Sequence, residues 1–235
     1  MPYRRLPNTD VARLRAFNAA LDVVDTVSPQ ELLYTQKLLL QIKPFVPLFE
    51  QALEQYNSAR QMQAQLSRKV SETSKSARMY LSHFIQVFNM CIARGEIKSE
   101  VREMLGLADG NLPDLSNDVQ LLEIGAKVIE GEERRGAMGG GNRIYNPSIA
   151  VVKVKFSQFK EQYEKYRDIM QTKEKHREKL AQMREKADIL IVMLWNEIES
   201  SLLPIDTNAK REKCQKYGVV YVYRPQERHR EFLRI

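Results

Sequence analysis

Apolar side chains recur at steps of three and four residues along two long stretches of the chain. This spacing puts them on one face of an α-helix and predicts helices over residues 45–94 and 147–203. Gly95 after the first stretch, the pair Asn146-Pro147 before the second and Pro204 after it are typical helix ends. The recurring positions are Phe45, Phe49, Ala52, Tyr56, Ala59, Leu66, Val70, Ala77, Phe84, Val87 and Cys91, then Val152, Phe156, Phe159, Tyr163, Tyr166, Met170, Leu180, Met183, Ala187, Leu190 and Leu194.

Two helices of this length are expected to pair with each other in antiparallel order, with coiled-coil-like packing. Aligning Phe49 with the Trp195 region makes both helices polar at the same level, over residues 55–75 and 171–186. The predicted fold class is all-α, a long antiparallel helical hairpin with short helices at both ends. A compact up-and-down helical bundle is the competing interpretation.

Residues 1–50 are predicted to form short helices that pack with residues 187–225 at one end of the long pair. The first of these helices covers residues 8–25 and has an apolar stripe. Its members are Leu14, Phe17, Leu21 and Val24.

A second short helix is expected to begin at Ser28-Pro29-Gln30-Glu31, which has the spacing of a capping box. Leucines and isoleucine follow it up to Ile42. Pro44 and Pro47 are then expected to kink or break the chain before the long helix begins, because proline removes a helical N–H donor.

Residues 95–146 are predicted to form a helical lobe at the other end, with six basic and ten acidic residues. It contains a short helix, a loop and a longer helix capped by Ser116. The inward positions of that longer helix are Val119, Leu122, Ala126 and Ile129. The glycine-rich loop 136–141 is interpreted as a flexible connector, with an anion-binding cradle as the alternative.

Residues 207–235 form a basic tail, with eight basic and three acidic residues. A short helix is predicted up to Gly218. The β-branched and aromatic run 219–223 then predicts a strand, which needs a partner for its backbone groups. The candidate partners are residues 3–6 and 143–145.

Composition restricts the class of protein. The chain has 235 residues with a net charge of +7, 43% hydrophobic residues and 2 Cys, which excludes disordered, membrane-spanning and disulfide-rich secreted classes. No secretory signal is recognised near the first residues, and the longest apolar run, 189–195, is far shorter than a membrane span. We therefore expect a cytoplasmic protein with two reduced thiols.

Candidate chemistry is sparse, and we expect neither an enzyme nor a cofactor or metal site. None of the three histidines stands in a metal-binding motif, and His83 and Cys91 are interpreted as core residues. The adjacent carboxylates Glu132 and Glu133, and likewise Glu197 and Glu199, are assigned to solvated faces without a catalytic role. Trp195 is interpreted as an anchor of the core near the N-terminal helices.

The basic tail mixes cations with aromatic residues, the types that neutralise phosphates and stack on bases. A solvated basic end is the alternative interpretation. The candidate contact residues are Lys210, Arg211, Lys213, Lys216, Tyr217, Tyr221, Tyr223, Arg224, Arg228 and Arg230.

Three stretches carry a resemblance to other proteins: residues 1–10 (MPYRRLPNTD), Ile144-Tyr145-Asn146-Pro147 and residues 217–223 (YGVVYVY). With this pattern the chain resembles a group of bacterial helical proteins of uncharacterised function. The resemblance implies a helical fold and no activity or site.

The expected function is a non-enzymatic helical scaffold or adaptor that contacts another protein or a second copy of itself. The strand at 219–223 is a candidate for β-addition to a partner. Nucleic-acid binding through the basic tail is the alternative function, and no membrane partner is expected.

Overall fold

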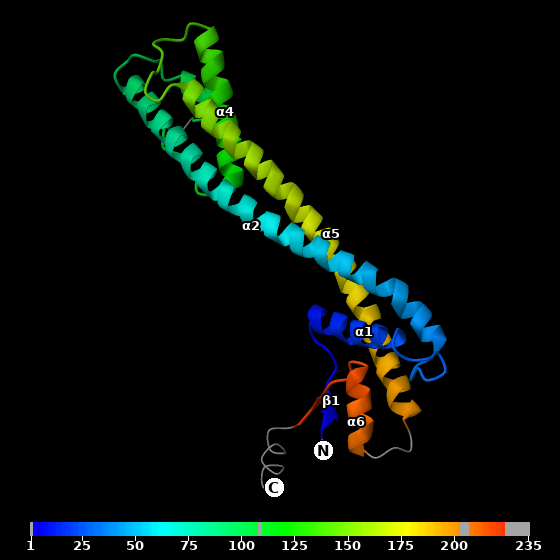
Figure 1. Cartoon of the computed structure of the whole chain (residues 1–235). Helices are drawn as coiled ribbons and strands as arrows, with labels where there is room; N and C mark the ends of the chain where they lie inside the picture. Colours follow the sequence, from blue (N-terminus) through cyan, green and yellow to red (C-terminus); the bar gives the residue numbers. More distant parts are fainter. Residues whose placement is uncertain (1, 108–109, 203–206, 224–235) are drawn as a thin grey trace. The chain divides into compact units, whose positions relative to one another are not determined.

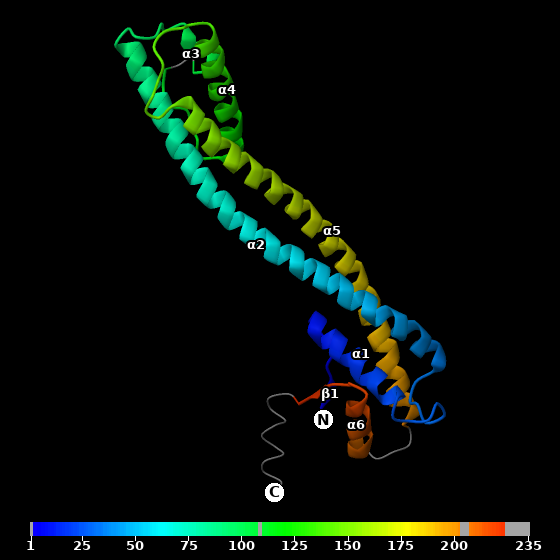
Figure 2. The same cartoon turned by 45° about the horizontal axis from the view of Figure 1, so that its top comes forward.

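The computed structural model describes residues 2–107, 110–202 and 207–223, and within them the fold is all-α, as predicted. Figures 1 and 2 show the long helices α2 and α5 side by side. Pro204 and residues 224–235 of the basic tail lie outside the described part. The elements are β1 (Tyr3–Arg4), α1 (Asp10–Val24), α2 (Gln36–Ala93), α3 (Val101–Met104), α4 (Asp118–Ala137), α5 (Ile149–Ser201), α6 (Thr207–Lys216) and β2 (Tyr221–Val222).

The chain forms two compact units, each with its own hydrophobic core. Unit 1 takes its residues from both ends of the chain, Met1–Ser58 and Lys173–Ile235, whereas unit 2 is the continuous segment Ala59–Thr172. The long helices α2 and α5 contribute to both cores.

Aromatic side chains from three helices fill the core of unit 1. Phe17 of α1 meets Phe45 of α2 edge to face, with ring centroids 5.8 Å apart, and Phe45 stacks on Phe49. Trp195 of α5 is fully buried beside them. The predicted role of Trp195 as a core residue is therefore confirmed.

Two bidentate ion pairs fasten α1 to α5 in unit 1. Arg13 donates to both carboxylate oxygens of Asp188, at 2.7 and 2.9 Å. Arg184 donates in the same way to Asp10, at 2.8 and 2.7 Å. Each helix supplies the arginine of one pair and the aspartate of the other, so both pairs form only when α1 has this orientation on α5.

The predicted C-terminal strand exists, and its partner is one of the two candidates. Strand β2 pairs antiparallel with β1, with Tyr3 opposite Val222 and Arg4 opposite Tyr221. The Arg5 N–H continues the ladder by donating to the Val220 carbonyl at 2.9 Å. The segment 3–6 therefore supplies hydrogen-bond partners for the backbone groups of β2.

Unit 2 packs α3 and α4 against its parts of α2 and α5. Gly131 of α4 touches α3 so closely that a Cβ atom there would lie 2.3 Å from the Met104 carbonyl oxygen. The buried apolar residues of α4 are Leu121, Val128 and Ile129, while Val119 and Ala126 are exposed. The predicted inward face was therefore partly wrong. The buried face of α4 also contains glycines and charged residues, which a search for apolar positions does not detect.

Helix α2 begins earlier than the sequence predicts and contains both prolines. The Ser28 N–H and hydroxyl both donate to the Glu31 carboxylate, which is only half of a capping box because the Ser28 side chain does not accept from the Glu31 N–H. No helix starts there, and α2 begins at Gln36 after Thr35. Pro44 and Pro47 are exposed, while Phe45, Val46 and Phe49 are buried. Core packing therefore overrides the local break.

The pairing register of the long helices differs from the prediction. The Thr35 N–H donates to Glu197 at 2.8 Å, and the Lys186 ammonium lies 5.4 Å from the Phe45 ring, whereas the predicted alignment puts Phe45 opposite Glu199. The physical reason is burial: Phe45 and Phe49 pack in one core with residues of α1 and with Leu190, Leu194 and Trp195, which a match of polar stretches does not take into account. The polar middle is confirmed by burial: along α2 and α5, described throughout, no side chain is buried between Ala59 and Val70 or between Phe159 and Leu180.

Two predicted helix starts also move. Asn146 and Pro147 form a turn with a cis peptide bond, and α5 begins at Ile149. Helix α4 is capped by Asn117, whose side chain accepts from the Val119 N–H at 2.8 Å, in place of Ser116. Gly95 has a φ of 75° and follows the end of α2 as predicted.

Candidate functional site

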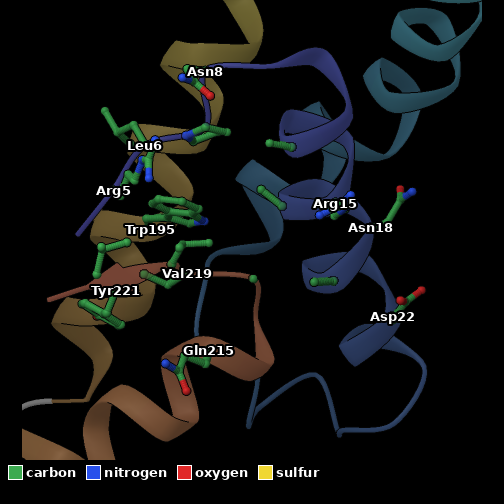
Figure 3. Close-up of a pocket in the computed structure, with 17 residues that line it drawn as sticks. Arg5, Leu6, Asn8, Arg15, Asn18, Asp22, Trp195, Gln215, Val219 and Tyr221 are labelled. Atoms are coloured by element: carbon green, nitrogen blue, oxygen red, sulfur yellow. The ribbon is translucent and has the colours of Figure 1, made fainter. Parts of the chain in front are cut away.

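A groove of about 800 Å³ in unit 1 runs between α1 and the strand segment, and Figure 3 shows its lining. We call it the α1 groove. Its volume is within the range of ligand-binding clefts. It is lined by residues 5–8, by Ala12, Arg15, Ala16, Asn18, Ala19 and Asp22 of α1, by Trp195, and by Gln215 and residues 218–222.

Small side chains on α1 make room for the groove. Phe17 points into the core, whereas Ala12, Ala16 and Ala19 recur at helical spacing on the groove side. Gly218 has a φ of 85°, and a Cβ atom there would lie 2.9 Å from the Ala16 carbonyl oxygen. Glycine therefore lets the segment after α6 approach α1 closely.

Glu199 of α5 holds the strand wall of the groove in place. One carboxylate oxygen accepts from the Tyr221 hydroxyl at 2.6 Å, and the other accepts from Arg4 at 3.1 Å. Burial, followed by the bond to Glu199, raises the pKa of Tyr221 well above its ordinary value, so the phenol stays protonated and keeps donating. A single carboxylate thus fixes both β1 and β2.

The indole of Trp195 forms the base of the groove. Its Nε1 atom is buried and, in the part of the chain that is described, has no hydrogen-bond acceptor. Figure 3 shows the nitrogen edge of the ring turned toward α1. A buried donor without an acceptor costs about 1–3 kcal/mol, and because the indole is fully buried, an acceptor has to displace part of the groove wall to reach it.

Three charged side chains line the groove, and all three are exposed: Arg5, Arg15 and Asp22. Guanidinium groups bind carboxylates through paired hydrogen bonds. The arrangement can therefore recognise an anion beside an apolar surface.

The candidate residues of the basic tail have different environments. Lys213 and Lys216 are exposed, while Lys210, Arg211 and Tyr223 are half-buried. Arg224, Arg228 and Arg230 lie outside the described residues.

Two tyrosines of that set are already engaged within unit 1. Tyr217 is buried, with its ring edge-on to Tyr34 at 6.2 Å. Tyr221 is half-buried and bonded to Glu199. Neither ring is a free surface on which a base can stack.

The glycine-rich loop does not present free amides to an anion. The N–H groups of Gly139, Gly140 and Gly141 each donate to a backbone carbonyl. The loop carbonyls of Gly140 and Asn142 accept from Arg135, which also forms a buried ion pair with Glu132 at 2.6 Å. The loop carbonyls therefore accept hydrogen bonds from Arg135. The assignment of Glu132 to a solvated face was wrong, because Glu132 is buried in this ion pair.

The remaining chemistry-bearing side chains do not assemble into a cluster. His83 is exposed, in contrast to its predicted place in the core. Cys91 and Cys214 are free thiols, and burial raises the pKa of each, so neither is an activated nucleophile. Within residues 2–107, 110–202 and 207–223, no three His, Cys, Asp or Glu side chains are placed to hold a metal ion.

Two signals for the groove are present in the sequence but were not used: the alanine spacing on α1, opposite its apolar stripe, and the single tryptophan of the chain. None of the helices in the described ranges is long and apolar enough to cross a membrane. Comparison with protein-family models, with curated proteins and with solved structures finds no match.

Proposed function

We propose that this protein is a non-enzymatic helical adaptor that binds a segment of a partner protein in the α1 groove. The carrying observation is the buried Trp195 N–H without an acceptor at the base of a groove of about 800 Å³. A peptide backbone supplies carbonyl acceptors at regular intervals, and the alanine wall of α1 leaves room for it.

The walls of the groove support binding of a chain segment. Leu6 and Pro7 provide apolar surface, while Asn18 and Gln215 provide exposed amides at its margin. This combination of apolar walls and a few polar groups is typical of sites that bind by shape and orientation. The strand β2 lies in the same wall, so the proposed β-addition and the groove involve one region of unit 1.

Site-specific cross-linking in the native host tests this function. A photoreactive benzoyl-phenylalanine replaces Asn18 at the groove, and a matched protein carries it at the exposed Glu72 of unit 2. We expect light to attach one defined segment of one partner at position 18 and not at position 72. Ala19→Trp, which fills the groove, should abolish that adduct.

The function is contradicted if position 18 gives no protein adduct, or if both positions give the same adducts. Circular dichroism of the Ala19→Trp protein checks that its helices are intact. The adduct is mapped by mass spectrometry, which identifies the attached segment as well as the partner.

Nucleic-acid binding is the second function, with Lys213 and Lys216 as the exposed cations of α6 that support it. Because the rings of Tyr217 and Tyr221 are already engaged, this function would depend on contacts between the lysines and phosphates rather than on base stacking. Lys213→Gln with Lys216→Gln should then weaken binding of a single-stranded oligonucleotide and flatten its salt dependence. Fluorescence anisotropy measures this, and equal binding by wild type and variant removes those two lysines from the function.

A further inference from the structure

We propose that the segment bound in the α1 groove is an extended acidic peptide with two adjacent acidic residues. This inference rests on the proposed function and adds the chemistry of the partner. It is argued from three observations: the pairing state of the arginines in unit 1, the Trp195 N–H, and the length of the groove.

The two arginines that line the groove, Arg5 and Arg15, have no carboxylate partner among the described residues. Arg4, Arg13 and Arg184 of unit 1 pair with Glu199, Asp188 and Asp10. Arg5 and Arg15, one and two residues along the chain from two of these, form no side-chain hydrogen bond or ion pair within the described residues. Carboxylates are the natural partners of such guanidinium groups.

The two free arginines come from opposite walls of the groove. Arg5 belongs to the segment between β1 and α1, and Arg15 belongs to α1 itself (Figure 3). Successive side chains of an extended peptide point in opposite directions. Two adjacent acidic residues can therefore pair with Arg5 and Arg15 at the same time.

The backbone of such a peptide also satisfies the indole. The Trp195 N–H lies between the two walls, where α1 presents Ala12, Ala16 and Ala19. A peptide carbonyl is a neutral acceptor that tolerates an apolar setting once it is hydrogen-bonded. The acidic side chains can thus reach the exposed margins, and a carbonyl reaches the base where the peptide displaces the wall over the fully buried indole.

The groove has room for about four or five extended residues. From Ala12 to Asp22 the helix rises by about 15 Å, and an extended peptide advances about 3.3 Å per residue. Asp22 lies about 10 Å beyond Arg15 along α1, so that end favours a neutral or basic peptide residue. The groove therefore orients the peptide as well as selecting its charge.

The test uses three acetylated and amidated hexapeptides that differ only in two central residues, Glu-Glu, Gln-Gln or Lys-Lys, flanked by valine and alanine. Trp195 is the single tryptophan of the chain, so its emission and its indole N–H resonance report on this site alone. We expect the Glu-Glu peptide to bind at least ten-fold more tightly than the Gln-Gln peptide. The indole proton should shift downfield on binding, and the Glu-Glu affinity should fall as salt rises.

Variants of the full chain locate the preference. Arg5→Gln and Arg15→Gln should each reduce the Glu-Glu preference by about five- to ten-fold, since about 1–1.4 kcal/mol corresponds to that range. Asp22→Asn should preserve or increase it. Arg60→Gln removes an exposed arginine of unit 2 and is the matched control, for which no change is expected.

Four outcomes overturn the inference: no hexapeptide binds, the three bind equally, the preference survives both groove arginine variants, or Arg60→Gln reduces it as much as they do. Thermal unfolding by circular dichroism confirms that each variant is folded. Cross-linking at position 18 is independent of these peptides. A groove that cross-links a partner but shows no charge preference would keep the proposed function and reject the acidic peptide.

Discussion

Arg135 is a buried cation in unit 2 whose hydrogen bonds join a helix to the loop that follows it. Its side chain is 2% exposed, and Nε and Nη2 donate to Glu132 at 2.7 and 2.6 Å. Nη1 donates to the carbonyls of Gly140 and Asn142 at 2.8 and 3.1 Å. The bond to Glu132 raises the pKa of Arg135 despite burial, so the guanidinium stays charged.

Glu132→Leu should therefore lower the free energy of unfolding of unit 2 by about 3–5 kcal/mol, because it leaves a buried charge without a counter-ion. The double variant Glu132→Leu with Arg135→Leu should lose less, since neither charge remains. Urea denaturation followed by circular dichroism measures both. The exposed pair Glu130–Arg134 in the same helix is the matched control, and Glu130→Leu should change stability by less than about 1 kcal/mol. A double variant that is no more stable than the single one would contradict this account.

Tyr34 links stability to alkaline pH. Its hydroxyl donates to the Ala20 carbonyl at 2.9 Å, and burial raises the pKa of Tyr34 from 10.0 to about 12. Above pH 10 the unfolded chain loses this proton while the folded chain keeps it. Stability should therefore fall between pH 10 and 12, and Tyr34→Phe should reduce that slope while costing about 1 kcal/mol at neutral pH. Denaturant titrations at several pH values measure it, and an unchanged slope in the variant would disprove the role of Tyr34.

Helix α4 shows how glycines set the distance between elements. A Cβ atom on Gly131 would meet the Met104 carbonyl oxygen at 2.3 Å, whereas one on Gly136, also inside the helix, meets nothing within 4 Å. Alanine favours helix by about 1 kcal/mol over glycine wherever space permits. The same substitution is therefore expected to have opposite effects at two positions five residues apart.

Gly131→Ala should lower the free energy of unfolding by about 1–3 kcal/mol, because α3 and α4 must separate. Gly136→Ala should raise it by about 0.5–1 kcal/mol. Chemical denaturation of the two variants side by side gives the comparison. Destabilisation by both substitutions would show that the end of α4 needs glycine for another reason.

Helix identity was predictable at this scale, and helix ends were less so. The three- and four-residue spacing identified α1, α2, α4 and α5 because each buries one face. The start of α2 was missed because Pro44 and Pro47 count as breakers locally, and only the packing of Phe45 and Phe49 overrides them. The face of α4 was missed because its buried stripe includes Gly125, Glu132 and Arg135, which carry no apolar signal.

On the scale of the whole molecule, the polar middle of the long helices is the feature that the sequence predicted best. Runs of charged residues leave no buried side chain between Ala59 and Val70 or between Phe159 and Leu180, in helices that are described throughout. The α1 groove was not predictable in the same way. It depends on Gly218, Trp195 and the strand register, which come from distant parts of the sequence.

Amide hydrogen exchange should be uneven along both long helices. Residues 60–69 and 160–179 lack buried side chains and should exchange faster than residues 81–88 and 190–198, which pack in the two cores. Mass spectrometry of peptic fragments at neutral pH measures the rates. Uniform protection along α2 and α5 would contradict this expectation.

A ribosome makes the two halves of unit 1 at different times. Residues 59–172 can pack their core as they emerge. Phe17, Phe45 and Phe49 cannot pack with Trp195, and β1 cannot pair with β2, until the C-terminal part has been synthesised. At about 5–20 residues per second, the interval from residue 58 to residue 223 is roughly ten to thirty seconds. During that time the apolar faces of the first helices lack their partner surface, so this is the interval in which a nascent chain is exposed to misfolding and aggregation.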